Sequence, residues 1–240
     1  MKLGEFVEIS VSVTDLMRSL TFYERLGFRK IEQSWEPWPW VILTDGTVIL
    51  NLSQYSVPSK PILSYIANDM YRIVEQLKIL GFEMTPLLSR EIPGTQGFIA
   101  PGGIGLALVE HSTRKITPPA GESLCHCGDF KELAFPVPDL RGSLDFWLQV
   151  GFEVKRSNEF PSPWASLSDG LIQLGLYQSG GFSEAALSYT SDDTVERIRG
   201  LKQKGYRFRT ELPSLLGGLG KAVMETPDKQ LLLFLEKAMD

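Results

Sequence analysis

The 240-residue chain contains one long sequence twice. Residues 6–53 align without a gap with residues 130–177. Identical pairs include Phe6/Phe130, Glu8/Glu132, Asp15/Asp139, Gly27/Gly151, Trp40/Trp164, Asp45/Asp169 and Leu52/Leu176. A repeated unit of 20–50 residues would predict a solenoid, whereas a unit of this length predicts two copies of one domain. We call them the first and second copy.

The composition excludes several classes of protein. Hydrophobic residues make up 43% of the chain and charged residues 22%, which is typical of globular proteins. The net charge is −5 and no basic run occurs, so we expect no nucleic-acid partner. No apolar stretch is long enough to span a membrane. The start of the chain lacks a secretory signal, and the only cysteines are Cys125 and Cys127, so we expect a cytoplasmic protein.

Each copy opens with an alternating strand pattern. In Phe6–Val13 every second residue is Val or Ile, so the apolar side chains share one face and Glu8 lies on the other. Asp15 then stands where a helix N-cap is expected, and Gly27 where a helix should end. Glu132 takes the place of Glu8 in the second copy.

The remaining periodicity completes an α+β protein. In the first copy we expect a second helix over Asp69–Leu80 and further strands over Phe28–Gln33, Trp38–Leu43, Thr47–Leu52, Ile62–Ala67, Phe82–Thr85, Phe98–Ala100 and Leu106–Val109. Each copy then reads as two βαβββ modules, four in the whole chain. The expected domains are residues 1–111 and 128–240, joined by a linker over residues 112–127, where the hydrophobic periodicity stops.

The phrase V-x-D-L-x-x-S-L-x-F-Y/W-x-x-x-G-F occurs at Val13–Phe28 and again at Val137–Phe152. Together with the Asp-Gly hairpins and the closing segment Pro227–Glu236, it resembles the vicinal oxygen chelate superfamily, the glyoxalase/bleomycin resistance/dioxygenase fold. The resemblance implies two tandem cup-shaped mixed sheets of eight strands, with helices outside. It does not fix the function, because this fold hosts isomerases, dioxygenases, thiol transferases and metal-free antibiotic-binding proteins.

The resemblance also implies where a divalent cation would bind. Enzymes of this family hold it with four inward side chains, usually His, Glu or Gln. The matching positions here are Glu8 or Glu132, Asn51 or Gly175, a residue near Pro61–Ile62 or Ala185–Ala186, and Ala107 or Leu233. Each copy therefore keeps one competent ligand, with the weak amide oxygen of Asn51 added in the first. A cation needs three or more such donors, so we expect no metal and no cofactor.

Glu8 and Glu132 are the most informative polar residues. A carboxylate inside an apolar cup suits a general base or an anchor for a ligand amine or hydroxyl. It can equally be bound to a Tyr, Ser or Arg of a neighbouring strand, or lie in water at the cup mouth.

Aromatic residues gather on equivalent hairpins of the two copies, namely Trp35, Trp38, Trp40, Phe160 and Trp164. They can stack on a planar ligand or pack in the core. Tyr65 and Tyr189 lie on equivalent strands, with phenols available to Glu8 and Glu132 or to a ligand.

Cys125-His126-Cys127 could chelate zinc with His111, but the Cys-x-Cys spacing is tighter than structural zinc sites use. We favour a solvent-facing connector with free thiols.

Three functions fit this sequence. The main hypothesis is metal-independent binding of a small apolar or aromatic ligand, as in sequestration or resistance. A cationic ligand would be favoured by Coulomb and cation–π terms. The expected ligand-binding residues are Glu8, Trp38, Trp40, Asn51, Tyr65, Glu132, Trp164 and Tyr189. The alternative is a lyase, isomerase or dioxygenase that uses a metal through unusual ligands, or Glu8 or Glu132 as base. A third possibility is that one copy serves only as a scaffold for the other and that the protein's role is to bind a partner. We expect a monomer, because the duplication already supplies what single-domain relatives obtain by pairing.

Overall fold

A computed structural model describes residues 1–54, 61–85, 95–111, 121–160, 162–178, 182, 184–209 and 220–237. These residues form helices α1 (Leu16–Arg25), α2 (Met70–Ile79), α3 (Leu140–Gln149) and α4 (Thr194–Gln203). The first copy contributes strands β1 (Phe6–Ser12), β2 (Arg29–Ser34), β3 (Trp40–Thr44), β4 (Ile49–Ser53), β5 (Ile62–Ala67), β6 (Thr95–Ala100) and β7 (Ile104–Glu110). The second contributes β8 (Asp129–Pro136), β9 (Glu153–Asn158), β10 (Trp164–Ser168), β11 (Gln173–Tyr177), β12 (Ala186–Ser191), β13 (Gly220–Glu225) and β14 (Leu231–Glu236).

Each copy builds its own mixed sheet, and equivalent strands occupy equivalent places. The first sheet has the order β2-β3-β4-β1-β5-β7-β6 and the second the order β9-β10-β11-β8-β12-β14-β13. The two modules of a copy join where β1 pairs antiparallel with β5, or β8 with β12. The predicted α+β class and the two tandem sheets are confirmed.

Each sheet has seven strands in the described residues, not the expected eight. The segment Phe82–Thr85 forms only an isolated bridge between Thr85 and Gly97. Phe82 and Met84 pack on the hydrophobic core. Phe208 makes the corresponding single bridge to Met224.

The helix starts follow the sequence signals. Asp15 caps α1, with its Oδ1 accepting from the Arg18 amide at 3.0 Å. Asp139 caps α3 by accepting from the Arg141 amide. Such caps satisfy amides that have no partner within the helix. Gly27 follows α1 at φ 103°, a conformation that favours glycine.

The two faces of each sheet carry different side chains. The Val and Ile face of β1 joins one large hydrophobic cluster that includes residues of both sheets and of all four helices. The opposite faces carry two smaller clusters, one around Ile42 in the first sheet and one around Leu233 in the second. We call the face that carries Glu8 cup one, and the face that carries Glu132 cup two. Ile9 and Val11 of β1, and Leu133 and Phe135 of β8, belong to the large cluster, so Glu8 and Glu132 lie on the opposite sheet face, as the alternation predicts.

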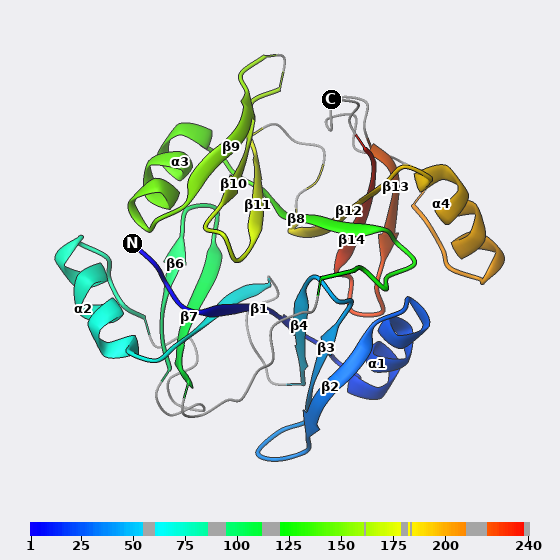
Figure 1. Ribbon diagram of the computed structural model, residues 1–240, viewed down its shortest axis with the longest axis horizontal. Coiled ribbons are helices and arrows are strands. Elements are labelled where there is room, and N and C mark those ends of the chain that lie inside the picture. The colour runs from blue at the N-terminus through cyan, green and yellow to red at the C-terminus, as the bar shows by residue number, and fades with distance from the viewer. Residues whose placement is uncertain are drawn as a thin grey trace.

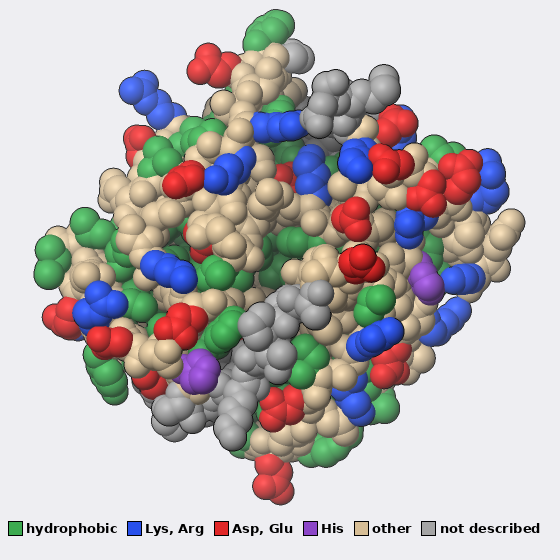
Figure 2. Space-filling model, in the orientation of Figure 1, with side chains coloured by type: hydrophobic (Ala, Val, Ile, Leu, Met, Phe, Trp, Pro, Cys, Tyr) green, Lys and Arg blue, Asp and Glu red, His purple; other side chains and the backbone are tan. Residues whose placement is uncertain are grey.

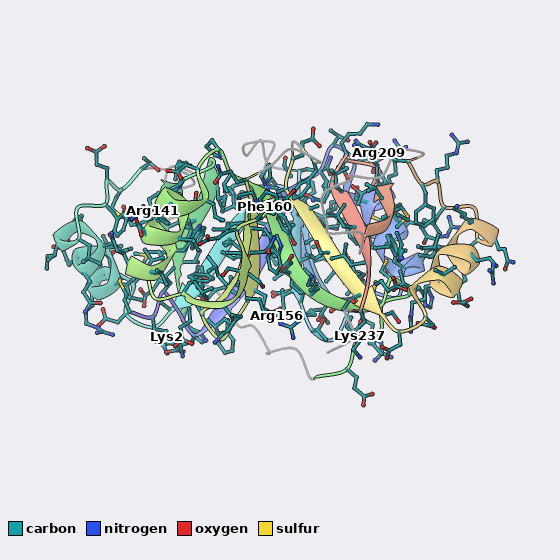
Figure 3. All side chains as sticks on the ribbon, turned by 90° about the horizontal axis from the view of Figure 1, so that it is seen from above. Lys2, Arg141, Arg156, Phe160, Arg209 and Lys237 are labelled. Carbon is teal, nitrogen blue, oxygen red and sulfur yellow. The ribbon has the colours of Figure 1, made fainter. Side chains whose placement is uncertain are left out.

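The copies are joined through the large cluster. Figure 1 shows α2 on the same side as α3, and α1 on the same side as α4; Figure 3 shows these helices at the two ends with the sheets between them. The rings of Phe22 and Tyr206 meet at 5.5 Å, and those of Phe82 and Phe146 at 5.2 Å. Asp228 of the second copy accepts hydrogen bonds from Thr14 and from the Ser19 hydroxyl of the first.

The prediction that the connector faces solvent is wrong for its two cysteines. Residues 112–120 lie outside the described residues, but Cys125 and Cys127 are 3% and 1% exposed. Both thiols belong to the cluster between the copies, because this segment is threaded between them. Burial raises the pKa of the Cys127 thiol well above its ordinary value. His126 remains exposed.

In the part of the chain that the structure describes, none of the helices is long and apolar enough to cross a membrane.

Candidate functional site

The centre of cup one holds a buried pair of polar side chains. Glu8 on β1 is 1% exposed and Asn51 on β4 is 8% exposed. The Asn51 amide donates to Glu8 Oε1 at 3.0 Å. Asn51 Oδ1 is buried and has no hydrogen-bond partner in the described residues. An unpartnered buried acceptor is costly, so this oxygen is suited to receive a ligand donor.

Two serines extend this polar row across the sheet. Ser10 on β1 and Ser64 on β5 share one hydrogen bond of 2.9 Å, in which either can donate. Ser64 lies directly opposite Glu8, and Ala107 lies beside Ser64. Ser64, and Ser188 in the second copy, are therefore inward positions, and so are Ile62 and Ala186 two residues earlier, where the resemblance places the third ligand. The serine pair as a whole retains one hydroxyl hydrogen that can be donated.

Cup one is lined around this row by apolar and short side chains. Ile42, Ile49, Ile66 and Val109 form a buried cluster on which Phe6 and Trp40 pack. Beyond Ser64 the inward positions include Ala107, Gly105 and Gly97, which have little or no side chain, and the Ile62 side chain packs over Gly105. A planar ligand would therefore meet apolar walls with a polar strip between them.

Cup two is built differently around Glu132, which is 0% exposed. Tyr177 donates to Glu132 Oε1 at 2.5 Å, and Ser166 donates to Glu132 Oε2 at 3.1 Å. Both carboxylate oxygens are thus satisfied by the protein. Burial, with Glu132 adjacent, raises the pKa of Tyr177 far above its ordinary value.

The counterpart of Asn51 in cup two is Gly175. A Cβ at Gly175 would lie 2.7 Å from the Tyr177 ring and would also overlap the Glu132 carboxylate. The ring of Tyr177 then stacks on Trp164 at 6.3 Å and meets Phe182 at 5.5 Å. Aromatic side chains of the protein therefore fill the centre of cup two.

The predicted aromatic residues separate into different places. Trp40 packs in cup one and Trp164 in cup two. Trp38 is half-buried just before β3. Trp35 is 54% exposed and Phe160 is 84% exposed, so these two take no part in either cup centre.

The expected position of Tyr65 and Tyr189 is wrong. Both side chains point to the opposite face of their sheets and join the cluster between the copies. Tyr65 donates to Asp169 Oδ2 in the other copy at 2.6 Å. The cause is the period of two, since Tyr65 directly follows Ser64 and so lies on the other face.

Sequence reasoning missed Ser10, Ser64, Ser166 and Tyr177. The strand alternation already placed Ser10 on the face of Glu8, so it could have been found. Tyr177 had a weaker signal, its place two residues after Gly175 on the same face of β11.

No protein-family model and no curated protein shows a significant match to this sequence. Solved structures do match. A catechol 2,3-dioxygenase matches with a TM-score of 0.65 at 12% identity, over 99% of this chain and 89% of that one. A variant of homoprotocatechuate 2,3-dioxygenase from Brevibacterium fuscum matches with 0.63 at 14% identity, over 100% and 72%. A 2,2',3-trihydroxybiphenyl 1,2-dioxygenase from Sphingomonas wittichii matches with 0.61 at 15% identity, over 98% and 90%.

The chain has the vicinal oxygen chelate fold. At these identities the likeness establishes the fold alone, and the roles of the residues must come from the sites described above.

The main functional expectation, metal-independent sequestration, is overturned by this finding. The matching proteins are dioxygenases along nearly the whole chain, which favours the alternative expectation of an enzyme.

Enzymes of the vicinal oxygen chelate fold hold a divalent cation, and the donor set tests whether this chain could hold one. Glu8 and Asn51 Oδ1 offer two oxygens in cup one, with Ala107 at the fourth position. Cup two offers Glu132 with Leu233 at the fourth position. Within the described ranges, no group of three or more His, Cys, Asp or Glu side chains could hold a metal. These residues do not fit a resident cation, so no chemical step below is derived through one.

Proposed function

We propose that this protein is an enzyme that removes a proton from a small hydroxylated aromatic molecule held in cup one, with Glu8 as the general base. This proton removal is the first step of a glyoxalase-like lyase or isomerase reaction, and the bond changes that follow it are set by the substrate. The observation that carries the proposal is the buried Glu8–Asn51 pair. The Asn51 N–H group orients the Glu8 carboxylate, and the Asn51 Oδ1 atom accepts no hydrogen bond in the described residues and so can accept one from a ligand.

Each polar group of cup one has a role toward such a substrate. One substrate hydroxyl donates to Asn51 Oδ1 and fills its missing bond. A second hydroxyl gives its proton to the Glu8 carboxylate, so that the O–H bond breaks and the charge moves to the substrate oxygen. The Ser10–Ser64 pair donates its remaining hydrogen to that oxyanion. The cluster around Ile42 and Trp40 supplies the apolar walls for the ring.

The comparisons support the substrate class. The matching structures are dioxygenases of catechol, homoprotocatechuate and trihydroxybiphenyl, all small hydroxylated aromatic molecules. Oxygenation of a molecule of this class is the second candidate, because those proteins are dioxygenases. A cytoplasmic location, a monomeric state and the absence of a metal stay predictions.

The first test is spectroscopic. A nitrocatechol changes its visible absorption when it ionises, so proton removal can be followed directly below the pH at which the free compound ionises. We expect the wild-type protein to produce the ionised band and the Glu8→Gln variant to lose it, while Glu132→Gln retains it. An ionised band of equal size in wild type and Glu8→Gln would refute the role of Glu8.

The second test separates the two reaction classes. Oxygen uptake and product formation are measured with a panel of catechols, with and without added divalent iron or manganese. Turnover without oxygen uptake supports the lyase or isomerase. Metal-dependent oxygen uptake would replace it with the dioxygenase, and no turnover or ionisation with any catechol would reject both.

A further inference from the structure

A cavity of about 600 Å³ lies between the two copies, outside both polar cup centres. Figure 2 shows a hollow near the middle of this face, bordered by hydrophobic side chains. Its walls come from the starts of β1 and β8 and from the hairpins before β4 and β11. A volume of this size is within the range of small-molecule sites.

The cavity is lined by equivalent residues of the repeat. Phe6 and its counterpart Phe130 both line the cavity, and so do Val48 and its counterpart Ile172, so each copy contributes the same two apolar positions. Neither Phe ring is fully buried. These rings provide contact area for an apolar group.

Other equivalent lining residues of the two copies differ in polarity. Val7 of the first copy lines the cavity, whereas its counterpart in the second copy is Lys131. Likewise Ile49 has Gln173 as its counterpart, and Ser168 adds a hydroxyl on the same side. At these positions the first copy offers apolar side chains and the second copy offers a cation and hydrogen-bonding groups, while Glu5 and Thr47 are the polar lining residues of the first copy.

The charges favour an anion at the polar end. Lys131 is half-buried and makes no ion pair within the described parts of the chain. The acid on this cavity, Glu5, is exposed and already accepts from the Asn68 amide at 2.5 Å. An ammonium against apolar walls gains most from a carboxylate, which it can bind by a charge-assisted hydrogen bond.

We infer that this cavity is a second ligand site, which takes a small molecule with an apolar body and one carboxylate. The carboxylate binds Lys131, assisted by Gln173 and Ser168, and the apolar body lies between Phe6 and Phe130. The cavity shares the walls Phe6 and Ile49 with cup one. Its carboxylate-binding residue Lys131 belongs to the second copy and is not part of the chemistry proposed for Glu8, so either proposal can fail alone.

The probe for the test is naphthoate, with naphthamide as its uncharged analogue. Binding is measured by amide chemical shifts of the isotope-labelled protein, which need no catalytic activity. We expect saturable shifts at Gly170 and Gln173, and an affinity for naphthoate about tenfold above that for naphthamide, since a charged hydrogen bond is lost.

Two variants locate the site. Lys131→Gln should lower naphthoate affinity about tenfold and leave naphthamide unchanged, whereas Lys155→Gln should change neither. Lys155 is a suitable control because it is an exposed lysine of the same copy, paired with Glu153. Leu171→Trp should abolish binding of both probes by filling the cavity. Equal affinity for the acid and the amide, shifts centred on Glu8 and Asn51, or no saturable shift up to the solubility limit would overturn the inference.

Discussion

The two cups share a fold and a central glutamate but satisfy that glutamate in different ways. In cup one Glu8 accepts a hydrogen bond from the Asn51 amide, and the residue directly opposite it is Ser64, with Ala107 beside that serine. In cup two Glu132 receives two hydroxyls, and Tyr177 fills the space that Gly175 leaves. Duplication thus left one cup with a polar acceptor still to be satisfied and closed the other with its own aromatic side chains.

The largest effect should come from exchanging the glutamates for glutamine one at a time. Glu8→Gln removes the base, so turnover should fall by about a hundredfold or more. Glu132→Gln should leave kcat within about twofold. It should lower the free energy of unfolding by roughly 1–3 kcal/mol, because the amide N–H₂ of the new side chain would face the Ser166 and Tyr177 hydroxyls, which donate to the carboxylate in the wild type. Steady-state kinetics and denaturant unfolding of both variants check this. The reverse assignment would show that cup two is the active cup.

Gly175→Ala tests whether cup two is filled. The added methyl overlaps Glu132 and Tyr177, so we expect roughly 1–3 kcal/mol of destabilisation by overpacking. Gly200→Ala is the matched control, since it lies within α4 with nothing within 4 Å of its Cβ position. That change should stabilise by up to about 1 kcal/mol. Thermal unfolding distinguishes them, and a stable Gly175→Ala protein would mean that cup two has free space.

Tyr177→Phe tests the closing hydrogen bond alone. The ring still fills the cup, but Glu132 Oε1 loses its donor, and we expect a cost of about 1–2 kcal/mol. Tyr71→Phe, at a side chain that is 70% exposed, should change stability by less than about 0.5 kcal/mol. Chemical denaturation of the two variants gives the comparison, and equal stabilities would remove the Tyr177–Glu132 bond from the account.

The smallest effect concerns the hairpin aspartates behind the cups. Asp169 accepts from Tyr65, whereas the equivalent Asp45 has no partner for its Oδ2 in the described residues. Burial raises the pKa of Asp45 above its ordinary value. The unfolded chain therefore loses this proton at lower pH than the folded protein, and stability falls as the pH rises from the ordinary carboxyl pKa through the raised one. Asp45→Asn should flatten that part of the profile of unfolding free energy against pH. An unchanged slope would contradict the prediction.

Much of the architecture could be predicted from the sequence. The repeat gave the two sheets, the Asp caps gave the helix starts, and alternation placed Glu8 and Glu132 on the cup faces. The partners of those glutamates could not be predicted as well, because strand register decides them. Ser64 lies opposite Glu8 and Tyr65 does not, and a shift of one residue reverses that assignment.

The burial of the two cysteines in the connector could not be predicted from the sequence either. Cys125 and Cys127 follow a segment without hydrophobic periodicity, and nothing local shows that two sheets close over them. Only the packing of one copy on the other determines their position.

The cluster that runs through both sheets decides how the molecule comes apart. The largest hydrophobic cluster contains side chains of both copies, so each copy depends on the other for part of its core packing. Heating should therefore dismantle both halves in one event, and calorimetry should record one endotherm. A fragment that contains only one copy would expose a large apolar surface to water, and we expect it to associate with another molecule or to aggregate.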